Sequence, residues 1–244
     1  MIDTHAHLDA LDDPSGAIAR ARAAGVERVI AIGSGLDSTR KTLAIAGGEA
    51  GVSVAAGIHP HQAADRESLD ELAAAMDAKV VAIGEIGLDF YRDYAPREDQ
   101  RQAFSAQLDL AAALDKPVIV HSRAADEETE AALEEFGGTV VLHCFSSAGL
   151  LPVALERGYY VSFAGNVTYP KAVELRDAAA RVPAHRILAE TDCPYLAPQP
   201  VRGKRNEPAY VVHTVASLAQ TRGEDTEELT RQIDANASAA FGLR

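Results

Sequence analysis

The sequence of 244 residues contains no tryptophan, and only 5% of its residues are aromatic, so its core must be built from aliphatic and alanine side chains. No apolar stretch approaches the roughly 18 residues that a membrane-spanning helix needs. No basic segment followed by an apolar one, as in a signal peptide, opens the chain. We therefore expect a cytoplasmic protein with no membrane partner.

Cysteine and basic residues are also scarce. The two cysteines, Cys144 and Cys193, lie far apart and fit no zinc or disulfide spacing. Lysine and arginine number 23 against 36 aspartates and glutamates, which gives a formal net charge of -13. Because proteins that coat long nucleic acids normally present a basic face, this charge argues against an extended DNA groove. A small site for a strand end or a compact anionic ligand remains open, since bound divalent cations reverse the local field.

The chain does contain a repeated alternation of short apolar strands with helices. Helix signals include Pro14 near the start and Gly25 beyond the end of the first helical segment. A chain with eight such units, close to the length of about 250 residues that is typical, predicts a single (β/α)8 TIM barrel over 1–244. Residues 226–242 predict an added C-terminal helix. The candidate strands are 1–8, 28–34, 52–59, 80–87, 117–122, 139–145, 159–165 and 186–192.

Six side chains with metal-ligating atoms fall at the ends of predicted strands, where barrel enzymes have their active sites. Alternation along a strand points His5 and His7 the same way, with Asp3 one layer deeper, and aligns Glu190 beneath Asp192. Imidazole and carboxylate groups suit Zn²⁺, Mn²⁺ and related ions, and six of them can hold two ions. The six are His5, His7, Glu85, His121, His143 and Asp192. Each alone has an ordinary explanation, such as a helix cap or an ion pair.

Other polar residues follow the same strands. His59 and His61 end strand 3 and either face the site or are solvated loop residues. Basic side chains at the same end of the barrel are either substrate contacts or solvated surface charge. Those that follow strands 4, 5 and 8 are Arg92, Arg123, Arg202, Lys204 and Arg205. We expect His59, Arg123 and the 202–205 cluster to contact an anionic substrate.

These residues lie in motifs that resemble the TatD family of metal-dependent hydrolases, a branch related to the amidohydrolase barrels. The resemblance runs essentially end to end. It departs from the commonest pattern at Ser147, Asn166 and Cys193, none of which is a proposed ligand. The matching motifs are DTHAHLD, GIHPH, GEIGLDFYRD, REDQRQAF, KPVIVHSR, HCFSS, SFAGNVTYPKA, ETDCPYLAP, GKRNEP and NASAAFG.

The resemblance implies a site for two divalent ions, Zn²⁺, Mn²⁺ or Mg²⁺. It assigns His5, His7 and Asp192 to one ion and His121 and His143 to the other, with Glu85 as the bridge. It also implies a nuclease that trims DNA or RNA from the 3′ end, or an esterase acting on aminoacylated tRNA.

We therefore expect a divalent-metal-dependent phosphodiesterase, a deoxyribonuclease of the 3′–5′ exonuclease type, acting on nucleic-acid ends or a small phosphodiester. In this hypothesis Asp192 takes the proton of a water activated by two metals, Glu85 bridges them, and Asp3 and Glu190 orient ligand imidazoles. One alternative is hydrolysis of a carboxylic ester, lactone or amide in a small molecule or aminoacyl-tRNA, which the acidic composition favours. Another is a non-catalytic binding barrel.

Overall fold

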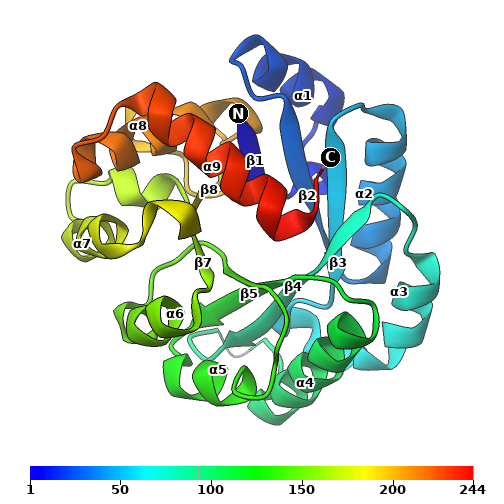
Figure 1. The fold of residues 1–244 in the computed structure, drawn as a ribbon. Helices are drawn as coiled ribbons and strands as arrows, with labels where there is room; N and C mark the ends of the chain where they lie inside the picture. Colours follow the sequence, from blue (N-terminus) through cyan, green and yellow to red (C-terminus); the bar gives the residue numbers. More distant parts are fainter. Residues whose placement is uncertain (93, 244) are drawn as a thin grey trace.

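The computed structural model describes residues 1–92 and 94–243, and for residues 65–68 the backbone alone. Eight parallel strands form one sheet in chain order, and helices alternate with them around the ring (Figure 1). The strands are β1 Ile2–Ala6, β2 Arg28–Ser34, β3 Val52–Gly57, β4 Val80–Asp89, β5 Val118–Arg123, β6 Val140–Leu142, β7 Tyr160–Phe163 and β8 Ile187–Ala189.

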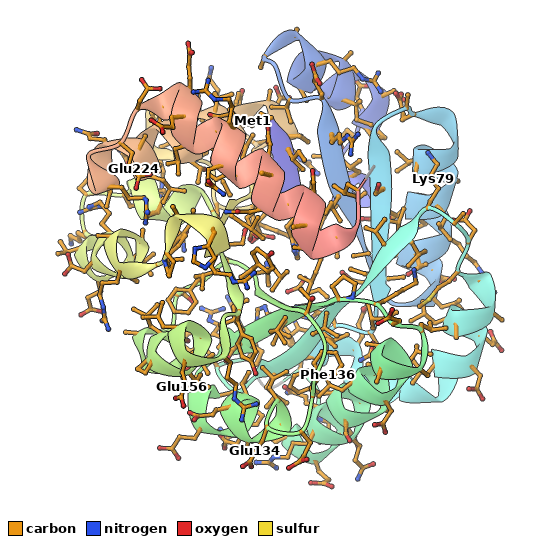
Figure 2. All side chains as sticks on the ribbon, viewed as in Figure 1. Met1, Lys79, Glu134, Phe136, Glu156 and Glu224 are labelled. Atoms are coloured by element: carbon orange, nitrogen blue, oxygen red, sulfur yellow. The ribbon has the colours of Figure 1, made fainter. Side chains whose placement is uncertain are left out.

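The α-helices lie outside the strands, with α9 as an exception described below (Figure 1). They are α1 Pro14–Ala23, α2 Leu36–Gly48, α3 Leu69–Ala75, α4 Arg97–Ala113, α5 Asp126–Ala132, α6 Leu151–Arg157, α7 Val173–Arg181, α8 Val211–Arg222 and α9 Thr226–Phe241. Short 3-10 segments in the loops are η1 Leu8–Ala10, η2 Pro60–Ser68, η3 Ala148–Leu150, η4 Gly165–Thr168, η5 Ala184–Arg186, η6 Gln199–Val201 and η7 Pro208–Tyr210. Exposed charges such as Glu134, Glu156 and Glu224 lie on the outer face of this ring (Figure 2).

The ring closes where the segment after β8 meets β1. The backbone N–H of Asp192 donates to the carbonyl of His5 at 2.9 Å, and the N–H of His7 donates to the carbonyl of Cys193 at 2.8 Å. These bonds join the last strand to the first. The predicted (β/α)8 barrel is therefore confirmed, and all eight predicted strands are present.

Two layers of apolar side chains hold the barrel together. One lies between the strands and the surrounding helices, and it contains most of the buried aliphatic residues. The other unites side chains from all eight strands with Ala237, Ala240 and Phe241 of α9. Because one face of each strand packs on the helices, this second layer fills the inside of the barrel.

The predicted C-terminal helix is confirmed, and it closes one end of the barrel. Figure 1 shows α9 crossing the ring of strands close to both chain termini. Asp225 caps it by accepting the N–H groups of Glu227 and Glu228. Asp234 on α9 accepts the N–H of Ile2 at 2.8 Å. The N-terminal ends of the strands are thus covered, which leaves the carboxyl ends for a site. None of the helices in the described part of the chain has the length and apolar character needed to cross a bilayer.

Candidate metal centre

The six predicted metal ligands meet at the carboxyl-terminal end of the barrel. His5 lies on β1 and His121 on β5, whereas His7, His143 and Asp192 lie just beyond β1, β6 and β8. The prediction that Glu85 ends strand 4 is wrong, because β4 continues to residue 89.

An extra residue in β4 accompanies the position of Glu85. Along the pairing of β4 with β5, Ile83 faces Val118 and Ile86 faces Val120, so three steps on β4 match two on β5. Such a bulge re-aims side chains and is common next to active sites. Glu85 lies within this irregular stretch and is 2% exposed.

The two oxygens of the Glu85 carboxylate face different groups of histidines. Oε2 lies 3.5 Å from Nε2 of His5 and 3.6 Å from Nε2 of His7. Oε1 lies 2.8 Å from Nδ1 of His121, 2.7 Å from Nε2 of His143 and 3.2 Å from Nε2 of His59. One carboxylate therefore stands between two sets of imidazoles, which is the arrangement expected of a bridging ligand.

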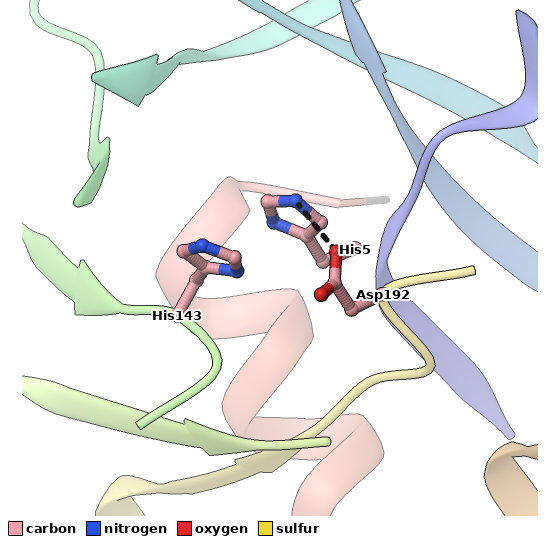
Figure 3. A group of neighbouring side chains, drawn as sticks. All are labelled: His5, His143 and Asp192. Atoms are coloured by element: carbon pink, nitrogen blue, oxygen red, sulfur yellow. Dashed lines mark ion pairs between the residues drawn. The ribbon is translucent and has the colours of Figure 1, made fainter. Parts of the chain in front are cut away.

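Asp192 lies beside His5 and His7, the two histidines that face Oε2 of Glu85. Its Oδ1 lies 3.4 Å from Nε2 of His7 and 3.9 Å from Nε2 of His5. The ring of His143 stacks on that of His5 with centroids 3.9 Å apart (Figure 3). Side chains from three separated parts of the chain thus converge on one point.

Glu190 occupies the supporting position predicted for it. Its Oε1 lies 3.1 Å from Nδ1 of His143 and accepts the backbone N–H of Cys144 at 2.8 Å. Asp3 differs from the prediction, because its oxygens accept the N–H and hydroxyl of Thr191 at 2.9 and 2.6 Å. Asp3 therefore supports the chain beneath Asp192 and does not orient an imidazole.

His59, predicted as a substrate contact, lies within the cluster. Its Nδ1 accepts the N–H of His61 at 3.0 Å, so Nε2 carries the proton and faces Glu85. Burial lowers the pKa of His59 to about 4 even though Glu85 opposes the change. The imidazole is therefore neutral at neutral pH. Its one N–H faces Glu85 and it carries no charge to attract a phosphate, so contact between His59 and a substrate stays a prediction.

Asp89 also belongs to the site, although it was not predicted from the sequence. This buried carboxylate lies 2.7 Å from Nε2 of His61 and 3.5 Å from Nε2 of His121. Its other oxygen accepts the backbone N–H groups of Tyr91 and Arg92. Asp89 thus links His121 to the loop at the mouth. The motif LDF contains it, but the strand predicted to end at residue 87 gave no reason to place it in the site.

Carboxylates and imidazoles shift one another's pKa values. Burial alone disfavours charge on Glu85, but His143 and the neighbouring imidazoles outweigh it and hold its pKa well below the usual range. Burial likewise opposes charge on His143, yet Glu85 and Glu190 raise its pKa well above the usual value. The pKa values of His7 and His121 are also raised, because carboxylates outweigh burial. The cluster therefore attracts positive charge.

The buried nitrogens test whether the residues suit cations. Both ring nitrogens of His5 and Nε2 of His121 are buried and lack a hydrogen-bond partner. Buried polar atoms are rarely left unpaired, so these atoms need a further partner. Three groups, each offering three ligand atoms within 4.8 Å of one another, are found among the described residues, and all contain His5 or Glu85. Imidazole nitrogens with carboxylate oxygens suit Zn²⁺, Mn²⁺ and similar ions, so the residues fit divalent metals.

The cluster opens into a cavity of about 950 Å³. Its lining includes His59 and His61 together with Arg92 and Arg123. Two guanidinium groups thus stand at the mouth of an otherwise acidic and histidine-rich site, where they suit an anionic substrate.

The predicted 202–205 cluster lies outside the lining of this cavity. The guanidinium of Arg202 stacks 3.9 Å from the ring of Tyr169. Arg205 pairs with Asp12 at 3.1 Å and donates to the carbonyl of Ala10, and Lys204 is exposed. Contact between these three residues and a substrate stays a prediction.

Comparisons with known proteins show which family and which fold this chain resembles. Residues 2–242 match the family described as TatD related DNase. The chain is 36% identical to the uncharacterized metal-dependent hydrolase YabD of Bacillus subtilis, over 100% of this chain and 99% of that protein. It is 39% identical to the 3′-5′ ssDNA/RNA exonuclease TatD of Klebsiella pneumoniae, over 95% and 92%. The crystal structure of YJJV, a TatD homolog from Escherichia coli, superposes with a TM-score of 0.92 at 32% identity, covering 100% of this chain and 98% of that one.

Proposed function

The chain belongs to the TatD related DNase family of metal-dependent hydrolases, and from this membership we propose that it hydrolyses phosphodiester bonds at the end of a nucleic-acid strand. The observation that carries the proposal is the Glu85 carboxylate, whose two oxygens face two separate groups of imidazoles. A relative 39% identical is named a 3′-5′ ssDNA/RNA exonuclease, which supports the same bond, and we propose 3′–5′ polarity on that basis.

The proposal assigns each ligand set to one divalent ion. His5, His7 and Asp192 would hold one, His121 and His143 the other, and Glu85 both. His143 also lies close enough to His5 and Asp192 to share an ion with them, and the proposal assigns it to the second ion because its Nε2 lies 3.3 Å from Nδ1 of His121. When bound, two such ions lower the pKa of water and neutralise charge that develops on a phosphate.

The chain's own residues then act on the substrate and on the proton. Although burial raises the pKa of Asp192, His7 and His5 outweigh it, so this carboxylate is ionised at neutral pH. It accepts the proton of the attacking water as the water oxygen bonds to phosphorus and the bond from phosphorus to the sugar oxygen breaks. The departing sugar oxygen takes up a proton from solvent. Arg92 and Arg123 at the mouth bind phosphate oxygens, whereas the Nε2 proton of His59 faces Glu85 and holds that carboxylate in place.

A strand end suits the charge of the protein better than a long duplex does. The net charge of -13 disfavours binding along extended DNA, whereas the two cavity arginines need to hold only one or two phosphates. The cytoplasmic location also stays a prediction, which cell fractionation tests.

A substrate panel tests the proposal. End-labelled single-stranded DNA and RNA, aminoacyl-tRNA, and chromogenic esters and lactones are each incubated with Mg²⁺, Mn²⁺ or Zn²⁺ and with a chelator. We expect chelator-sensitive release of mononucleotides, and Glu85→Ala abolishes turnover and loosens metal binding. Near-normal activity in Glu85→Ala contradicts the scheme.

The acidic surface favours a second candidate, hydrolysis of a carboxylic ester, lactone or amide. A nucleophile that attacks phosphorus also attacks a carbonyl carbon, so the same ligands serve either reaction. Turnover of esters or charged tRNA without any nucleotide release indicates this candidate. No chelator-sensitive turnover on any substrate indicates a non-catalytic binding barrel.

A further inference from the structure

Aromatic side chains are scarce in this chain, yet several gather at the mouth of the cavity. Of the five large hydrophobic side chains that are exposed in the described residues, three are tyrosines on two mouth loops. Tyr91, Tyr94 and Tyr195 are 64%, 65% and 57% exposed. Tyr94 and Tyr195 also line the cavity. Large aromatic rings left in solvent beside a polar site are available to a ligand.

Tyr94 and Tyr195 stand on opposite walls. Tyr94 follows β4 and Tyr195 follows β8, and these strands are half the barrel apart. The Tyr94 and His61 rings form a T-shaped pair with centroids 4.7 Å apart, and the Tyr195 and His7 rings form another at 5.9 Å. A phosphodiester held beside Glu85 would therefore have one exposed ring on each side.

The charges at the mouth differ between the two walls. The guanidinium of Arg123 lies 4.0 Å from the centroid of the Tyr91 ring. That of Arg92 lies 5.7 Å from Tyr91 and 6.0 Å from Tyr94. Asp9, which follows β1, lines a part of the cavity away from the two arginines, which follow β4 and β5. Both arginines of the cavity lining thus lie on the side of Tyr91 and Tyr94, whereas the 202–205 cluster that follows Tyr195 lies outside the lining. The lining itself therefore favours further phosphates on the Tyr94 side.

We propose that Tyr94 and Tyr195 stack on the two nucleobases that flank the scissile phosphodiester, with the terminal base on Tyr195 and the penultimate base on Tyr94. The rest of the strand then continues over Arg92 and Arg123. This inference rests on the proposed function and adds the side chains that hold the last two, unpaired bases of the strand. Because every base has a π-face, stacking accepts any sequence.

Abasic oligonucleotides paired with tyrosine variants test the proposal. Single-stranded oligonucleotides carry an abasic residue at the terminal position, at the penultimate position or at neither, and kcat/KM for release of the last residue is measured. The variants are Tyr94→Ala, Tyr195→Ala, Tyr94→Phe and Tyr195→Phe, with Leu114→Ala as an exposed control remote from the mouth. Circular dichroism confirms that each is folded.

We expect each alanine variant to lose about 5- to 150-fold in kcat/KM on the intact strand, the range for one stacked base. The phenylalanine variants keep most of the activity because they keep the ring. On the strand that lacks its terminal base, Tyr195→Ala has the same kcat/KM as the wild type. On the strand that lacks its penultimate base, Tyr94→Ala has the same kcat/KM as the wild type. Leu114→Ala matches the wild type on all strands.

Three results overturn the stacking proposal while leaving the proposed function intact, provided that the wild-type protein cleaves the strand. One is activity of the alanine variants equal to wild type, and another is a loss in the phenylalanine variants as large as in the alanine ones. The third is a loss in each alanine variant that persists on its matching abasic strand. Failure of the wild type to cleave any oligonucleotide overturns the proposed function itself.

Discussion

Oε1 of Glu190 lies 3.1 Å from Nδ1 of His143, a distance that fixes which nitrogen of that imidazole faces Glu85. Carboxylates behind metal-bound histidines set the ring orientation and raise its basicity, and their loss costs about 10- to 100-fold in metal affinity or activity. We predict that Glu190→Gln weakens divalent-metal binding by this factor. Competition with a chromogenic chelator measures it.

The matched control for that variant is Glu207→Gln, which removes a largely buried carboxylate that pairs with Arg20 at 2.8 Å outside the lining of the cavity. It should bind metal as the wild type does. Equal affinities for Glu190→Gln and the wild type would show that Glu190 has no role in the metal centre.

The affinity for metal should depend on pH even at pH values above the ordinary pKa of an imidazole. Metals bind deprotonated imidazoles, so protons compete with them. Burial lowers the pKa of His7, His121 and His143, but neighbouring carboxylates outweigh it and raise each above 6.5. The apparent affinity should therefore fall already as the pH decreases toward 6.5, with proton release on binding. Calorimetry in buffers of different ionisation enthalpy detects this release, and constant affinity at and above pH 6.5 contradicts the assignment.

Asp89 has two tasks that two substitutions separate. One oxygen accepts the N–H groups of Tyr91 and Arg92, while the other faces His61 and His121. An asparagine retains an acceptor for the loop but loses the charge, whereas an alanine loses both. We predict that both variants bind metal more weakly. Only Asp89→Ala should also lose about 1–3 kcal/mol of unfolding free energy, the cost of unpaired buried groups. Urea denaturation of both compares these losses, and equal stabilities refute the loop role.

A substitution on α9 should lower the stability of the protein without changing its catalytic rate. Phe241 is 4% exposed and packs inside the barrel at the end opposite the metal centre. Phe241→Ala should lower the free energy of unfolding by about 3–5 kcal/mol, while the folded fraction keeps its kcat. Val173→Ala, at a site 54% exposed on α7, serves as the control and should change stability by less than about 0.5 kcal/mol. A selective loss of kcat in folded Phe241→Ala would contradict this separation.

The sequence predicted the strands and the convergence of the six ligands because both follow from local rules. Short aliphatic runs between helices define strands, and the carboxyl ends of parallel strands meet at one rim. His5 and His7 both reach Glu85, as alternation along a strand predicts. The predicted end of β4 is two residues too early, because Gly87 and Asp89 still pair with β5. The local sequence pattern of β4 does not predict this pairing.

The loops could not be predicted, because their conformations depend on residues distant in the chain. Arg205 follows strand 8 but turns to Asp12 near the start of the chain. Arg123, by contrast, ends β5 and is held at the rim by the strand itself. Residues on a strand or within a few residues of its end therefore lie where the sequence predicts, whereas those farther along a loop, such as Arg205, do not line the cavity.

The most direct test of the central claim is anomalous diffraction from crystals soaked in Mn²⁺ or Zn²⁺. The account predicts two peaks, one on each side of the Glu85 carboxylate, the first among His5, His7 and Asp192 and the second among His121 and His143. A single peak, or peaks elsewhere with this cluster empty, would contradict it.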